Sequence, residues 1–154
     1  MIPPLTRKGL LPPGIHWTTW DEFAARYGGT PHRERLLAGL RAAIENLEQA
    51  GCREIYIDGS FVTRKVKPND FDACWNGEGV NEQLLDPVLL DFSNRRARMK
   101  EKYGGELFIA QAQADLEGGK RFLDYFQRDK RTGSPKGIIG IKLGQQMEGS
   151  DDPQ

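Results

Sequence analysis

Two aspartates spaced one residue apart, Asp70 and Asp72, are the side chains in this sequence best suited to chemistry. They begin an apolar segment, residues 70–75, that reads as a β-strand, in which alternate side chains point to the same face. Two carboxylates side by side repel each other, and burial without a counter-ion would force one of them to stay protonated. A hard divalent cation such as Mg²⁺ removes this repulsion, since it binds carboxylate and phosphate oxygens together. The pair therefore predicts a Mg²⁺ or Mn²⁺ site. The alternative is a turn acid and a solvated strand residue.

A glycine–serine turn precedes the pair. Gly59 and Ser60 follow a predicted strand at residues 54–58 and precede a predicted short helix at residues 61–65. The free backbone N–H groups at the start of such a helix favour a bound anion. Lys65 and Lys67 come next and are candidate partners for phosphate groups, the alternative being two solvated loop lysines.

The spacing of these residues resembles a known signature. Gly-Ser, nine residues and then Asp-Phe-Asp is similar to the motif of the nucleotidyltransferase superfamily that includes DNA polymerase beta. This resemblance implies that Asp70 and Asp72 bind Mg²⁺ and that Gly59 and Ser60 contact the triphosphate of an NTP. It also implies transfer of a nucleoside monophosphate to a hydroxyl group. Asp58 departs from the pattern, because the family usually has an apolar residue there.

The same resemblance implies a third acidic residue on a later strand. Glu106, which begins the apolar segment 106–110, is the residue we match to it, and Asp115 is the second choice. As a catalytic residue and metal ligand, Glu106 would complete the site with Asp70 and Asp72. The competing interpretation of Glu106 is an ordinary exposed residue at the start of a strand.

The outer segments, residues 10–28 and 122–143, resemble small bacterial and phage-associated nucleotidyltransferase-like proteins. This likeness implies an acceptor that is an RNA 3′ end or a protein hydroxyl, and a partner toxin or antitoxin. An alternative of another class is a catalytically inactive binding module, or antitoxin, that keeps the fold and docks on a partner.

The remaining pattern predicts an α+β fold, a small mixed β-sheet with helices packed on it. A capping box at Thr19–Glu22 begins a helix that ends near Tyr27, and Thr30-Pro31 begins a longer one. Further strands are predicted at residues 106–110 and 136–143. Residues 1–143 are predicted to form one domain that begins with an extended surface arm, residues 1–17, and residues 144–154 a disordered tail. The longer helix is predicted to bury Leu36, Leu37, Leu40, Ile44 and Leu47.

Composition narrows the class of protein. The formal net charge is zero, from 22 basic and 22 acidic residues, which argues against broad nonspecific nucleic-acid binding. No apolar run is long enough for a membrane span and no signal peptide precedes the domain, so we expect a cytoplasmic protein without a membrane partner. The two cysteines lack a CxxC spacing and are expected to be reduced.

Overall fold

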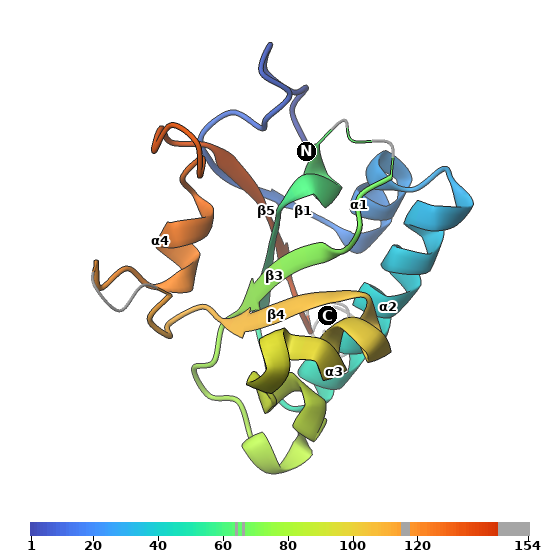
Figure 1. The fold of residues 1–154 in the computed structure, drawn as a ribbon. Helices are drawn as coiled ribbons and strands as arrows, with labels where there is room; N and C mark the ends of the chain where they lie inside the picture. The colour runs from blue at the N-terminus through green and yellow to red at the C-terminus, as the bar shows by residue number, and fades with distance from the viewer. Residues whose placement is uncertain (64, 66, 115–117, 145–154) are drawn as a thin grey trace, which may run out of the picture.

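The computed structural model describes residues 1–63, 65, 67–114 and 118–144, and of Ser60 the backbone alone. Within these residues the fold is the mixed α+β arrangement predicted above (Figure 1). One five-stranded sheet has the order β1-β5-β2-β3-β4. Its strands are β1 (Gly14–Thr18), β2 (Glu54–Asp58), β3 (Phe71–Trp75), β4 (Gly105–Ile109) and β5 (Gly137–Lys142).

Helices cover both faces of the sheet. On one side lie α1 (Trp20–Tyr27), α2 (Pro31–Gln49) and α3 (Ser93–Tyr103), and on the other lies the short α4 (Phe122–Phe126) (Figure 1). Alternate side chains of each strand point to opposite faces of the sheet. Ile55 and Ile57 thus lie in the larger core, whereas Tyr56 lies in the smaller core under α4. Three short 3₁₀ turns, η1 (Ser60–Val62), η2 (Glu82–Leu84) and η3 (Pro87–Leu90), complete the elements.

The helix starts and the main apolar stripe follow the sequence prediction. Thr19 and Thr30 cap α1 and α2, each accepting a hydrogen bond from a backbone N–H three residues on. All five residues predicted for the buried face of α2 are buried. The segment predicted as a short helix after Ser60 forms only the 3₁₀ turn η1.

The predicted surface arm is the main error of the sequence interpretation. Residues 14–18 form β1, which pairs in parallel with β5, and both Ile2 and Leu11 are buried. The Glu22 carboxylate accepts a hydrogen bond from the N–H of Ile2 at 3.2 Å, and Arg26 donates to the carbonyl of Ile2 at the same distance. The arm is therefore part of the folded domain. The predicted tail, apart from Gly144, lies outside the described residues, as does Asp115.

No helix in the described part of the chain is long and apolar enough to cross a bilayer.

One glycine fixes how closely two helices approach. A Cβ atom added to Gly39 in α2 would overlap the carbonyl oxygen of Tyr103, at the end of α3. Because α3 leads directly into β4, this contact sets where β4 begins.

We predict that Gly39→Ala lowers the free energy of unfolding by about 1–3 kcal/mol, because the methyl group forces the two backbones apart. Helix propensity alone predicts the opposite sign, a gain of about 1 kcal/mol. Urea denaturation measures the difference. Ala38→Gly, at the neighbouring exposed position, is the matched control and should cost about 1 kcal/mol through propensity alone. Stabilisation by Gly39→Ala would contradict the close approach.

Candidate functional site

Three carboxylates form a row across neighbouring strands. Asp58, the last residue of β2, is directly opposite Asp72 of β3 in the antiparallel register. Asp72 in turn is in register with Glu106 of the parallel strand β4. Residues in register on adjacent strands point to the same face, so all three side chains lie on the face that α4 partly covers.

The two outer carboxylates of the row are paired with cations. Asp58 accepts a hydrogen bond from Lys136 Nζ at 2.5 Å. Glu106 Oε1 accepts from Arg96 Nη2 at 2.8 Å and from Nε at 3.0 Å, and Lys100 Nζ lies 3.5 Å from the same oxygen. Within the described residues, no hydrogen-bond donor reaches the central carboxylate, Asp72.

The electrostatics of Asp72 follow from this arrangement. Burial raises its pKa most, and the negative charges of Asp70, Glu106 and Asp58 add to the effect, so the pKa is about 7. Burial also raises the pKa of Asp70, with a further contribution from Glu106, whereas Lys100, Lys130 and Lys65 oppose the rise. Asp70 thus belongs electrostatically to the same cluster, although it precedes β3.

Gly59 is required beside this row. Its φ of +83° lies in the left-handed region, and a Cβ atom there would overlap the carboxylate of Asp72. The glycine therefore lets the turn after β2 approach the central carboxylate directly.

Two side chains of the first turn of α2 hold the loop that follows Gly59. Arg33 is 7% exposed, and its guanidinium lies over the Phe61 ring at 5.0 Å. His32 donates through Nε2 to the carbonyl of Pro68, near the end of the loop. Burial lowers the pKa of Arg33. Its guanidinium donates to four backbone carbonyls, those of Tyr27, Phe61, Thr63 and Lys65.

A strained turn presents Arg96 to Glu106. Asn94, Arg95 and Arg96 all have positive φ values, of 51°, 55° and 60°. Such a conformation costs non-glycine residues roughly 1–2 kcal/mol each. It places the Arg96 guanidinium over the Phe108 ring at 5.5 Å as well as against Glu106.

The row opens into a cavity of about 650 Å³. Asp58, Gly59, Asp72 and Glu106 line one part of it, together with Arg96, Lys130 and Lys136. Phe108 and Phe122, stacked with ring centres 4.2 Å apart, line another part with Tyr125 and Phe126. A charged region that can bind phosphate and metal thus adjoins an aromatic region.

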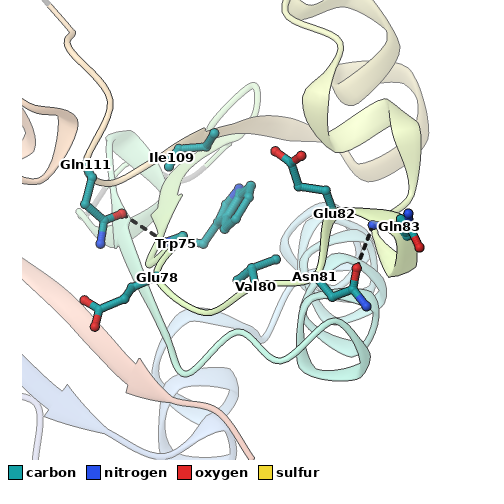
Figure 2. Close-up of a pocket in the computed structure, with 9 residues that line it drawn as sticks. Trp75, Glu78, Val80, Asn81, Glu82, Gln83, Ile109 and Gln111 are labelled. Atoms are coloured by element: carbon teal, nitrogen blue, oxygen red, sulfur yellow. Dashed lines mark hydrogen bonds between the residues drawn. The ribbon is translucent and has the colours of Figure 1, made fainter.

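A larger cavity, of about 780 Å³, lies at the opposite ends of β3 and β4. Figure 2 shows Trp75 in its middle, with Glu78 and Glu82 on opposite sides of the ring. Its lining contains no basic residue. The chemistry is therefore concentrated in the smaller cavity, although size alone favours this one.

The residues predicted from the sequence divide into two sets. The structure brings Gly59, Asp72 and Glu106 to one cavity and places Asp70 beside it. Lys65 and Lys67 are exposed in the loop, and of these Lys65 acts on Asp70 through its charge. Among the described residues, Lys67 makes no side-chain hydrogen bond or ion pair.

Sequence reasoning missed the roles of Arg33, Arg96 and Lys136. Arg96 and Lys136 lie in stretches rich in lysine and arginine, and nothing in the sequence separates them from neighbouring cations. A buried arginine on an otherwise amphipathic helix carries no local signal, since most of its partners are carbonyls far along the chain, those of Phe61, Thr63 and Lys65.

We predict that Asp72→Asn makes the protein more stable above pH 7 in the presence of EDTA. The wild-type carboxyl binds its proton more tightly in the folded state, with a pKa of about 7 against an ordinary 3.8. The free energy of unfolding that Asp72 contributes therefore falls as the pH rises from about 4 to about 7. Above pH 7 this loss of stability is complete. A gain of about 1–3 kcal/mol at pH 8 is expected from urea unfolding.

The control for this measurement is Asp124→Asn, an exposed carboxylate on α4. It should leave the pH dependence of unfolding as in the wild type. An Asp72→Asn protein whose stability also follows the wild-type pH curve would show that Asp72 does not carry the repulsion of the row.

Comparison with known proteins gives a family but no activity. No curated protein and no solved structure matches this chain. The sequence model of one family matches residues 3–142, almost the whole described chain, and the chain thus belongs to a family of unknown function (DUF6932).

Proposed function

We propose that this protein transfers a nucleoside monophosphate from an NTP to a hydroxyl group, with Mg²⁺ or Mn²⁺ as cofactor. One observation carries the proposal: a central carboxylate, Asp72, whose pKa is about 7, lies between two further carboxylates and against the Gly59 turn. Such a cluster is costly unless a cation binds it. The resemblance of the Gly-Ser and Asp-Phe-Asp residues to the nucleotidyltransferase motif supports the same activity.

The donor set fits a hard divalent cation. Asp70, Asp72 and Glu106 would hold it, since all three offer carboxylate oxygens within one electrostatic cluster. Across the described ranges no three His, Cys, Asp or Glu side chains form a ready-made metal cage. Phosphate oxygens and water would therefore complete the coordination, as is usual for Mg²⁺. When bound, the cation supplies charge neutralisation and lowers the pKa of the acceptor hydroxyl.

The residues of the chain bind and orient the nucleotide and accept the proton of the acceptor hydroxyl. Gly59 lets the turn after β2 lie directly against Asp72. The hydrogen bonds of Arg33 to backbone carbonyls hold the loop that follows this turn. The acceptor oxygen forms a bond to the α-phosphorus, the bond from that phosphorus to the bridging oxygen of the β-phosphate breaks, and pyrophosphate leaves. The proton of the hydroxyl passes to Glu106, which lines the same cavity.

The aromatic part of the cavity suits the planar base of the nucleotide, since aromatic faces stack with bases of any identity. The acceptor we propose is an RNA 3′ end or a protein hydroxyl, with a partner toxin or antitoxin as the setting.

A catalytically inactive binding module, or antitoxin, that docks on a partner is the second candidate. It is favoured by the ion pairs of the outer carboxylates, because Glu106 has to leave Arg96 and Lys100 before it can act on a substrate.

Incubation with each α-³²P-labelled NTP, Mg²⁺ and total cell lysate tests the transfer. We expect a labelled RNA or protein band with the wild type, and none with Asp70→Asn/Asp72→Asn or with EDTA. Absence of label with all four nucleotides would contradict the transferase activity and leave the binding module.

The role of Glu106 has its own test. Glu106→Gln should reduce turnover at least about a hundredfold, because the proton acceptor acts in the transition state. It should leave the affinity for the NTP nearly unchanged, because Asp70 and Asp72 still hold the cation on the nucleotide side. Calorimetry gives the affinity and the labelling rate gives the turnover. Glu101→Gln, an exposed position on α3, is the matched control. Wild-type turnover in Glu106→Gln would remove Glu106 from the site.

A further inference from the structure

The ion pair between Asp58 and Lys136 lies in an unfavourable place for a charge. The side chains are only 7% and 14% exposed, and 2.5 Å separates Asp58 Oδ1 from Lys136 Nζ. Burial raises the pKa of Asp58, and the charge of Lys136 opposes the rise without cancelling it. Taking both ions out of water costs several kcal/mol per ion, and apolar residues of similar size often replace such a pair without loss of stability. Stability alone therefore does not account for the pair.

The backbone fixes where the Lys136 ammonium lies. The N–H of Lys136 donates to the carbonyl of Gln127 at 2.9 Å, and the N–H of Gly137 donates to Leu11 at 3.0 Å. From Gly137 onward the chain is held between β1 and β2 as β5. The ammonium is thus held against the last residue of β2, at one end of the carboxylate row.

Further cations of the same segment surround this position. Lys130 and Arg131 line the cavity with Lys136, and the charge of Lys130 acts on Asp58, Asp70 and Asp72 alike. Asp129, the acidic residue between them and α4, is already engaged, because its carboxylate accepts hydrogen bonds from the N–H of Arg131 and the hydroxyl of Thr132.

We propose that Lys136, held by Asp58 and assisted by Lys130, forms a polyphosphate-binding subsite of this cavity. It receives the β- and γ-phosphates of the nucleotide and the pyrophosphate product. A lysine ammonium is a compact point charge that binds phosphate well, and here it lies beside the carboxylates that would hold the cation accompanying those phosphates. This assignment rests on the proposed function for the identity of the nucleotide. It also explains why an aspartate stands before Gly59 where the nucleotidyltransferase motif has an apolar residue.

The proposed subsite differs from the phosphate partners predicted from the sequence. Lys65 and Lys67 were the expected phosphate partners, but both are exposed in the loop and neither lines the cavity. Lys136 is fixed, partly buried and directed at the row.

Calorimetric titration of magnesium pyrophosphate tests the subsite without requiring catalysis. Lys136→Met alone leaves the Asp58 carboxylate buried and unpaired, so the informative variant is Asp58→Leu/Lys136→Met, which removes both charges. We expect this double variant to unfold at a urea midpoint close to that of the wild type, and to bind pyrophosphate at least about tenfold more weakly. Its affinity for orthophosphate should change less.

Lys142→Met is the matched control. This lysine is the last residue of β5, the strand that begins directly after Lys136. It lies over the Trp17 ring at 5.3 Å, outside the cavity, and its variant should bind pyrophosphate like the wild type. Wild-type affinity in the double variant would overturn the subsite and leave the pair a structural feature. A wild type that does not bind magnesium pyrophosphate would overturn it as well.

The two experiments test the subsite and the transfer reaction separately. Pyrophosphate binding that depends on Lys136, without labelling of any acceptor, would keep the subsite and remove the transferase. Labelling by the wild type, combined with unchanged pyrophosphate binding in the double variant, would keep the transferase and remove the subsite.

Discussion

Repulsion among carboxylates on neighbouring strands is the constraint around which this structure is arranged. The pairing of β2 with β3 and of β3 with β4 puts Asp58, Asp72 and Glu106 in one row on one face. The outer members are compensated by Lys136 and by Arg96, and the central one is left with a pKa of about 7. A sequence selected for stability alone would not keep three acids in register. We therefore propose that a cation and an anionic ligand complete the row.

The hydrogen bonds of Arg33 to the loop after β2 fix the geometry beside this row. A guanidinium can donate to several carbonyls at once, and Arg33 uses this property to hold the chain from Phe61 to Lys65 against the start of α2. The loop that leaves Gly59 consequently has little freedom to move away from Asp72. Because the helix cap at Thr30 positions Arg33, the local signal that begins α2 also orders the site.

Local patterns in the sequence predicted most of the elements. The period of two in residues 70–75 puts Phe71 and Ala73 on the face opposite Asp72, and in the structure both lie in the larger core. The capping threonines marked both helix starts. What failed was β1, whose five residues carry little alternation and whose partner, β5, lies at the other end of the sequence. The roles of Lys136 and Arg33 were not predicted for the same reason, since their contacts depend on long-range pairing. Glu106 was matched through a family resemblance, and its register with Asp72 could not be derived from its own surroundings in the sequence.

Binding of Mn²⁺, followed by the electron paramagnetic resonance signal of the free ion, tests the central claim most directly. The carboxylate row should bind Mn²⁺ in the wild type, and more tightly when an NTP is present, because phosphate oxygens complete the coordination. Asp72→Asn should lose this binding, since it removes the central ligand and the repulsion that favours a cation. The same Mn²⁺ isotherm in the wild type and in Asp72→Asn, with and without nucleotide, would contradict the claim that the row is a metal and nucleotide site.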